Sequence, residues 1–146
     1  MVLRSETATC IGDRDENQDC MYVSERLFAV ADGMGGHASG GLAARVAVSL
    51  LEGDPPDSAE LLHARLYQIH EELLRLGQEP GNYGMGTTLV AALFQQNKVH
   101  VVWVGDSRCY RLRNSELTQL TTDHNYYEGV RAMHGQATAD AMNRHL

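Results

Sequence analysis

Cysteine, basic residues and long hydrophobic runs are all scarce in this chain of 146 residues. Its three cysteines are odd in number and are not spaced as C-x-x-C, so the sequence indicates neither a disulfide framework nor a zinc site. Twelve Lys and Arg against 19 Asp and Glu give a net charge of −7, which argues against binding along a nucleic-acid backbone. No apolar run approaches the roughly 18 residues needed to span a bilayer, and no hydrophobic signal segment opens the chain. We therefore expect a cytoplasmic protein that binds neither nucleic acid nor membrane.

Glycine, by contrast, is concentrated in the stretch Ala29 to Gly41, which reads AVADGMGGHASGG. The apolar run before Asp32 predicts a buried strand, which delivers the carboxylate to a strand end, where chemistry is commonly located. The glycines that follow let the backbone present carbonyls or amides to whatever Asp32 binds. A flexible turn is the simpler interpretation of glycines alone. An unpaired carboxylate beside a tight turn needs a cation or hydrogen-bond partner, however, so the stretch indicates a site.

A second acid-rich stretch, residues 12–19, contains one arginine, Arg14. Taken alone, such a cluster is usually a solvated surface loop. The segments that follow it predict a hairpin with strands at 21–23 and 27–31. An antiparallel hairpin would bring Asp19 and Asp32 to the same end of the sheet. Two carboxylates at one sheet end, with Arg14 near them, form the first candidate site.

The rest of the chain predicts an α+β protein of one domain, a layered antiparallel β-sandwich flanked by helices. Ser39 is predicted to cap a helix whose apolar stripe comprises Leu42, Val46 and Leu50 with Ala43, Ala47 and Leu51. A second helix is predicted over Ala59–Leu76, and a short one over Ala139–His145. Strands are predicted at 2–11, 87–95, 99–104, 108–113 and 116–120, with the apolar run KVHVVWV as a core strand. Residues 84–88 lack the lysine and the following helix of a P-loop, so nucleotide binding is rejected.

Five stretches in order, RDENQD, ADGMGGHASGG, GMGTTLV, VGDSRCYRLR and LTTDH, resemble the metal-dependent protein serine/threonine phosphatases of the 2C type. This is the PPM family, and the stretches resemble most closely those of its bacterial branch. The resemblance covers Arg14 to His124 and implies two antiparallel sheets flanked by helices, with two Mn²⁺ or Mg²⁺ ions at one end. It implies that a metal-activated water dephosphorylates phosphoserine and phosphothreonine in proteins. A Ser/Thr kinase or its substrates would be among the phosphorylated partners.

The resemblance also assigns roles to individual residues. Asp32 would bridge both ions and the Gly33 carbonyl would bind one of them. Arg14 would hold the substrate phosphate. Gln18 and Asp19 match the pair that orients metal-bound waters, with Asp19 counted among the metal ligands, and Asp106 would support the site from further out. Oxygen ligands of this kind suit Mg²⁺ or Mn²⁺ better than zinc.

Two departures from the family pattern bear on activity. Met34 stands where many eukaryotic members carry a histidine suggested as general acid. His37 is a candidate substitute, with helix N-terminal capping or a simple surface position as the alternatives. The resemblance also leads us to expect Asp-Gly and Asp-Asn blocks that complete the metal shell, and neither pair occurs after Asp106. We therefore expect residues 1–146 to be a single phosphatase domain without roughly its C-terminal third, as a fragment, a natural truncation or half of a split domain. The alternative function is an inactive or weak pseudophosphatase that binds a phosphoprotein or other partner.

Overall fold

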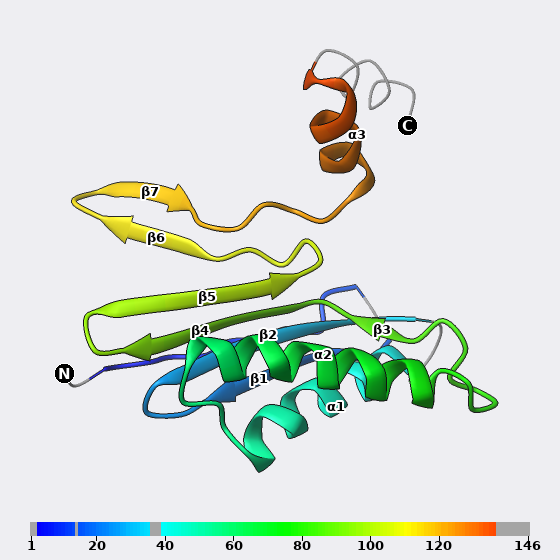
Figure 1. Cartoon of the computed structure of the whole chain (residues 1–146). Helices are drawn as coiled ribbons and strands as arrows, with labels where there is room; N and C mark the ends of the chain where they lie inside the picture. Colours follow the sequence, from blue (N-terminus) through cyan, green and yellow to red (C-terminus); the bar gives the residue numbers. More distant parts are fainter. Residues whose placement is uncertain (1–2, 14, 36–38, 137–146) are drawn as a thin grey trace.

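An antiparallel sheet of five strands is the largest element of the described chain, with the spatial order β1-β2-β4-β5 and with β3 paired to the end of β2 (Figure 1). Its strands are β1 Asp19–Val23, β2 Leu27–Met34, β3 Gly86–Thr87, β4 Leu89–Gln95 and β5 Lys98–Val104. A second sheet consists of β6 Tyr110–Arg113 and β7 Glu116–Gln119. The structure is a computed structural model that describes residues 3–13, 15–35 and 39–136. The predicted α+β class with antiparallel sheets and flanking helices is confirmed.

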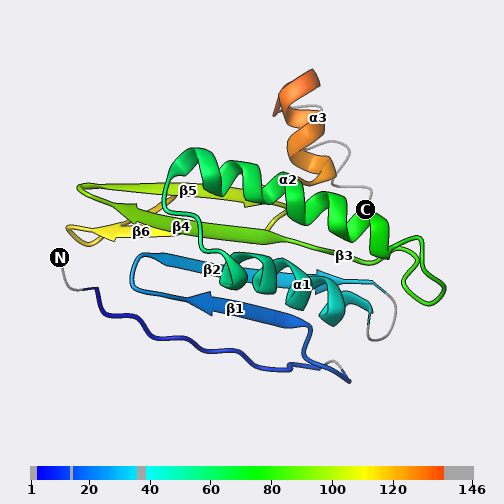
Figure 2. The same cartoon turned by 60° about the horizontal axis from the view of Figure 1, so that its bottom comes forward.

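Helices α1 (Ser39–Gly53) and α2 (Ala59–Leu76) cover one face of the five-stranded sheet (Figure 2). Alternate residues of β2 and β4 point toward these helices and are buried, because successive side chains of a strand face opposite sides. The buried strand residues are Leu27, Ala29, Ala31, Leu89, Ala91 and Leu93. The core of the molecule therefore lies between this face and the two helices.

The buried face of α1 differs from the predicted stripe. Ala43, Ala44, Ala47, Val48 and Leu51 are the buried nonpolar residues, whereas the predicted residues Leu42, Val46 and Leu50 are half-buried. Small side chains allow close packing, and the alanines of α1 share the core with the alanines of β2. Ala43, Ala47 and Leu51 of the predicted stripe are therefore confirmed as buried, whereas the buried face turns toward Ala44 and Val48 instead of Leu42, Val46 and Leu50.

Helix α2 has the predicted bounds, and the Ser58 side chain caps its N-terminus by accepting a hydrogen bond from the Leu61 amide at 3.2 Å. Two predictions about strands are wrong: the strand at 2–11, and the core position of the strand at 99–104, which is present as β5. Residues 3–11 are extended but belong to no strand of the described chain, because no neighbouring strand shares a ladder of hydrogen bonds with them. Strand β5 is half-buried or exposed along its length because it is an edge strand of its sheet.

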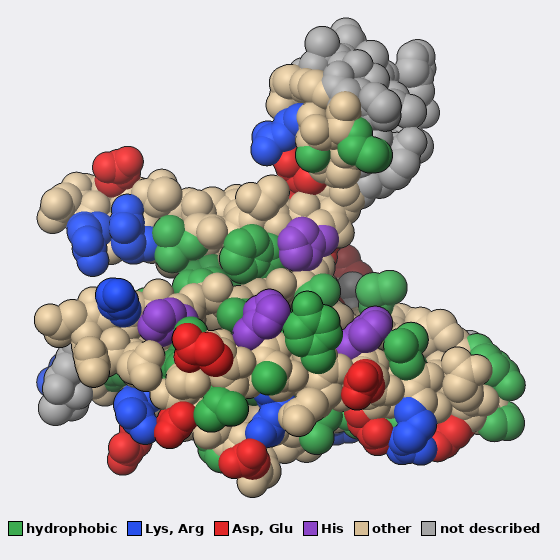
Figure 3. All heavy atoms as spheres, in the orientation of Figure 1, with side chains coloured by type: hydrophobic (Ala, Val, Ile, Leu, Met, Phe, Trp, Pro, Cys, Tyr) green, Lys and Arg blue, Asp and Glu red, His purple; other side chains and the backbone are tan. Residues whose placement is uncertain are grey.

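The opposite face of the sheet carries a thinner second layer. Residues 5–7 and 108–110 line a cavity of about 290 Å³ together with side chains from β1, β2 and β4. Val23, Val30 and Val99 remain 42–49% exposed. Figure 3, seen from the side of α2, shows a hollow between the β6–β7 hairpin and the elements below it, with hydrophobic side chains beside it. This face is therefore covered less completely than the face under the helices.

Helix α3 (Tyr126–His134) was not predicted, although the sequence carries a signal for it. The Asn125 side chain accepts a hydrogen bond from the Glu128 amide at 2.9 Å, which is the geometry of an N-terminal cap. The predicted helix at 139–145 lies outside the described residues. None of the helices within the described ranges combines the length and apolar character needed to cross a membrane.

Candidate active site

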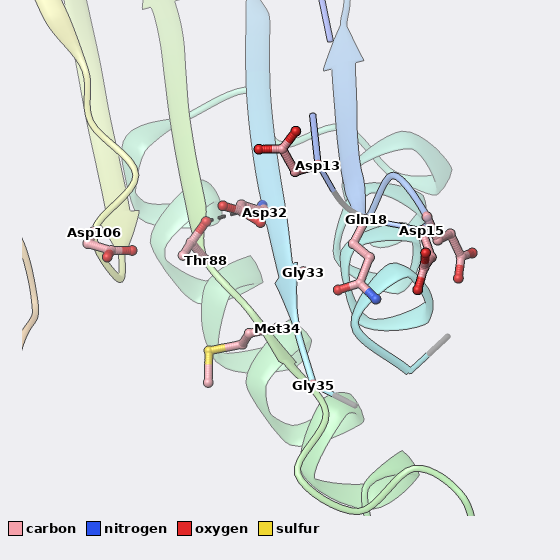
Figure 4. Close-up of a pocket in the computed structure, with 10 residues that line it drawn as sticks. Asp13, Asp15, Gln18, Asp32, Gly33, Met34, Gly35, Thr88 and Asp106 are labelled. Atoms are coloured by element: carbon pink, nitrogen blue, oxygen red, sulfur yellow. Dashed lines mark hydrogen bonds between the residues drawn. The ribbon is translucent and has the colours of Figure 1, made fainter. Parts of the chain in front are cut away.

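An acid-lined cavity of about 900 Å³ lies at the end of the sheet where β1 begins. Its lining comes from the acidic loop before β1, the end of β2, the junction of β3 and β4, and the loop after β5 (Figure 4). The described lining residues are Asp13, Asp15, Glu16, Gln18, Asp32, Gly33, Met34, Gly35, Thr88 and Asp106. Four predicted site residues are thus brought together from three separate parts of the chain: Gln18, Asp32, Gly33 and Asp106.

Asp32 lies within β2, two residues before its end, and not just after the strand as predicted. The strand is longer because β3 pairs with it, placing Gly33 opposite Thr87 and Met34 opposite Gly86. The predicted neighbour of Asp32 is in place, since Asp19 is its directly opposite residue on β1. The hairpin therefore brings both carboxylates to one sheet end, as the sequence indicated.

Asp19 is exposed and is not among the described residues that line the cavity. The Thr9 hydroxyl donates a hydrogen bond to Asp19 Oδ2 at 3.2 Å, and Asn17 Nδ2 donates to the same hydroxyl at 2.8 Å. The Asp19 amide donates to Asn17 Oδ1 at 3.0 Å. These contacts hold the start of β1 beside the cavity, and a role for Asp19 as a metal ligand stays a prediction.

The glycine-rich stretch allows α1 to approach β2 very closely at Gly33. A Cβ atom on Gly33 would lie 2.1 Å from the Gly40 carbonyl oxygen, and one on Gly40 would lie 2.5 Å from Gln18 Oε1. The Gly33 amide also donates a hydrogen bond to the Gln18 carbonyl at 3.1 Å. Gly33 and Gly40 are therefore required by packing, and they hold the first turn of α1 and the Gln18 side chain at the cavity.

Asp106 reaches the cavity from the loop between β5 and β6. The Ser107 hydroxyl shares a 2.6 Å hydrogen bond with the Thr88 hydroxyl, which in turn accepts one from the Asp32 amide at 3.1 Å. Gly105 has a φ of +95°, which favours glycine at the turn that leads to Asp106. This loop is therefore tied directly to the strand that carries Asp32.

The LTTDH stretch, residues 120–124, also contacts the loop between β5 and β6. The Arg108 guanidinium donates to both carboxylate oxygens of Asp123, with distances of 2.6–3.1 Å, and Asp123 is only 9% exposed. This guanidinium holds the pKa of the Asp123 carboxyl below its usual value. The His124 amide donates to the Gly105 carbonyl at 2.9 Å, and Trp103 Nε1 donates to the Thr122 carbonyl at 2.8 Å. The VGDSRCYRLR and LTTDH stretches thus stabilise each other.

Thr88 and the Arg108–Asp123 pair were missed as site-supporting residues. Both lie in stretches that carried the resemblance, but the sequence gives no signal for which hydroxyl or carboxylate would meet which partner. Arg14 and His37 lie outside the described residues, so their predicted roles stay predictions.

The charge of the cavity limits what it can bind. Five of the described lining residues are carboxylates, and none of the described lining residues is basic. Such a surface repels a phosphate unless cations neutralise it. Its donors are oxygen atoms, which suit Mg²⁺ or Mn²⁺. No three His, Cys, Asp or Glu residues within the described ranges are grouped closely enough to hold a metal ion alone.

Comparison with known proteins identifies the class. Residues 8–142 match the Protein phosphatase 2C family, and the chain belongs to this family. It is 38% identical over 138 residues to the serine/threonine protein phosphatase PstP of Mycobacterium tuberculosis, covering 90% of this chain and 27% of the relative. It is 37% identical over 138 residues to the serine/threonine phosphatase stp of Listeria monocytogenes, covering 88% of this chain and 53% of the relative. The chain therefore spans about a quarter and about half of the lengths of these two relatives.

The fold agrees with that assignment. The solved catalytic domain of PstP in complex with two manganese ions superposes with a TM-score of 0.75 at 35% sequence identity. That superposition covers 94% of this chain and 61% of the PstP chain.

Proposed function

We propose that this chain carries part of the active site of a metal-dependent protein serine/threonine phosphatase. The observation that supports it most directly is the cavity, where Asp32 and Asp106 face a space lined by oxygen donors in a member of this family. Phosphate cannot approach five carboxylates unaided, so cations are a physical requirement of the proposal. Mn²⁺ or Mg²⁺, two in the complete site, would activate water for attack on phosphorus and offset the negative charge that develops.

Each site residue has a specific task in this proposal. Asp32 supplies the central carboxylate, and the Gly33 carbonyl supplies a second oxygen donor beside it. Gln18, a neutral side chain at the cavity, orients water by hydrogen bonding, and Asp19 supports it from the start of β1. Asp106 contributes negative charge on the far side of the cavity. Arg14 binds the phosphate and offsets its charge.

Phosphoserine and phosphothreonine in proteins are the proposed substrates, with a Ser/Thr kinase or its substrates among the partners. The serine/threonine phosphatases among its relatives support this choice. Location in the cytoplasm stays a prediction, and so does the organisation of residues 1–146 as one domain.

The test is Mn²⁺-dependent hydrolysis of p-nitrophenyl phosphate and of a phosphothreonine peptide by the 146-residue chain. Activity that Asp32→Ala abolishes, while the variant keeps the circular dichroism spectrum of the wild type, supports the proposal. A soluble, folded chain with no hydrolysis at saturating Mn²⁺ contradicts catalysis by this chain.

A second candidate is a binding module for a phosphoprotein or another partner. It is favoured by the lack, among described residues, of a group of three metal-ligating side chains. Metal stoichiometry separates the two functions, because the proposed catalysis needs two ions and a binding module needs none. Isothermal titration with Mn²⁺ measures that number without any substrate.

A further inference from the structure

We propose that Thr88 is a positioning residue for Asp32, and that its hydroxyl also sets the place of the loop that carries Asp106. The inference rests on the proposed function, since it concerns how the two carboxylates of that site are held. Its basis is an irregularity of the sheet at one residue. Strands β3 and β4 pair with β2 in the same register, yet the pairing is interrupted at Thr88 between them.

The interruption is an exchange of hydrogen-bond acceptors. The Thr88 amide donates to the Asp32 carbonyl at 2.9 Å, as in a regular antiparallel pair. The return bond of such a pair would run from the Asp32 amide to the Thr88 carbonyl. Instead the Asp32 amide donates to Thr88 Oγ1 at 3.1 Å, and the Thr88 carbonyl accepts from the Thr87 hydroxyl at 2.8 Å. A side chain thus replaces a main-chain acceptor opposite Asp32.

The same hydroxyl reaches the second carboxylate-bearing segment. A hydroxyl has one proton and two acceptor lone pairs, so it can accept from the Asp32 amide and still share its 2.6 Å bond with Ser107 Oγ. Ser107 directly follows Asp106 in the loop after β5. Figure 4 shows Thr88 between Asp32 and Asp106, with the bond to Asp32 drawn. One buried hydroxyl therefore links the two sides of the cavity; Thr88 is only 8% exposed.

The methyl group of Thr88 has a separate contact. A Cβ atom on Gly105 would lie 2.7 Å from Thr88 Cγ2, so the methyl packs directly against the turn before Asp106. The two branches of the side chain can be removed one at a time. Thr88→Val keeps the branched shape and removes the hydroxyl, whereas Thr88→Ser keeps the hydroxyl and removes the methyl.

The experiment compares these two variants with the wild-type chain and with Thr118→Val, which removes a threonine hydroxyl on β7 away from the cavity. The first readout is hydrogen exchange of the Asp32 amide, followed by NMR without metal. The second is Mn²⁺ affinity from isothermal titration. We expect Thr88→Val to speed exchange at Asp32 and to weaken Mn²⁺ binding about 10- to 100-fold, as for other residues that orient metal ligands. Thr88→Ser and Thr118→Val should change neither readout by as much as about 10-fold.

A purely structural role predicts the reverse order, with Thr88→Val close to wild type and Thr88→Ser impaired, and that result overturns the proposal. Equal exchange rates at Asp32 in both Thr88 variants overturn it too. A wild-type chain that binds no Mn²⁺ contradicts the proposed function instead. In that case the exchange rate at Asp32 still decides whether the Thr88 hydroxyl holds this strand.

Discussion

Asp19 and Asp32 lie directly opposite each other on the antiparallel strands β1 and β2. Opposite residues in such a pair have Cβ atoms about 4.5–5.5 Å apart, and like charges there destabilise the sheet. A divalent cation bound at this end of the sheet would offset that repulsion. Cation binding and the stability of the hairpin are therefore expected to be linked.

The first prediction concerns this linkage. Mn²⁺ at 100 times its dissociation constant should stabilise the chain by about 2.7 kcal/mol, because it binds only the folded state. For a domain of this size that corresponds to a rise in Tm of roughly 8 °C. Asp32→Asn should abolish the rise, and Asp19→Asn should reduce it. Differential scanning fluorimetry with and without Mn²⁺ measures both, and an equal rise in Asp32→Asn would contradict the assignment of Asp32 as a ligand.

The second prediction concerns the contact between β2 and α1. Gly33→Ala places a methyl group 2.1 Å from the Gly40 carbonyl oxygen, so α1 must move away from the sheet. We expect a loss of about 1–3 kcal/mol in the free energy of unfolding, the usual cost of overpacking. Gly53→Ala is the matched control, because a Cβ there meets nothing within 4 Å at the end of the same helix. Urea unfolding compares the two, and equal midpoints would show that α1 can shift without penalty.

Much of the fold could be predicted because local signals and tertiary packing agree. Helix α2 has both a periodic apolar stripe and a capping serine, and its predicted bounds are confirmed. The strands predicted at 108–113 and 116–120 leave two residues for the β6–β7 turn, Asn114 and Ser115, and both have the positive φ that such a turn requires. The extended residues 3–11 could not be placed in the same way, since a strand is defined by a partner and not by its own residues.

The carboxylates of the site could be predicted from the sequence, but the residues that hold them in place could not. Asp32 and Asp106 each follow an apolar run, so their position near a strand end is visible in the sequence. Their connection through Thr88 depends on the register of three strands and on one side-chain rotamer. A hydroxyl among many serines and threonines gives no sequence signal of such a contact.

The third prediction tests the cap of α2. Ser58 accepts a hydrogen bond from the Leu61 amide at 3.2 Å, and that amide would otherwise lack a partner within the helix. Ser58→Ala should lower the free energy of unfolding by about 1 kcal/mol. Ser49→Ala, an exposed position inside α1, is the control and should change it by at most about 0.5 kcal/mol, because alanine favours helix. Equal effects of the two substitutions in urea unfolding would argue against the cap.

The fourth prediction concerns acid sensitivity through Arg108 and Asp123. The hydrogen bonds from Arg108 lower the pKa of the Asp123 carboxyl below its ordinary value of 3.8. A group whose pKa is lower in the folded state stabilises it above the unfolded pKa, and this contribution is lost as the pH falls through the folded value. The stability difference between wild type and Asp123→Asn should therefore be largest near neutral pH and should shrink below about pH 4.

Urea midpoints from pH 7 down to pH 2.5 measure this difference, with Glu116→Gln on β7 as a control for removing an exposed carboxylate. The control shows how much of the effect comes from removing any exposed carboxylate, since Glu116 is the exposed first residue of β7. Because the Asp123 segment also binds Gly105 and Trp103, acid should loosen the loop that carries Asp106 before the helical core unfolds. Tryptophan fluorescence from Trp103 should then change at a higher pH than the helical circular dichroism signal. If the difference in urea midpoint between wild type and Asp123→Asn stays constant down to pH 3, the ion pair does not cause the acid sensitivity of this loop.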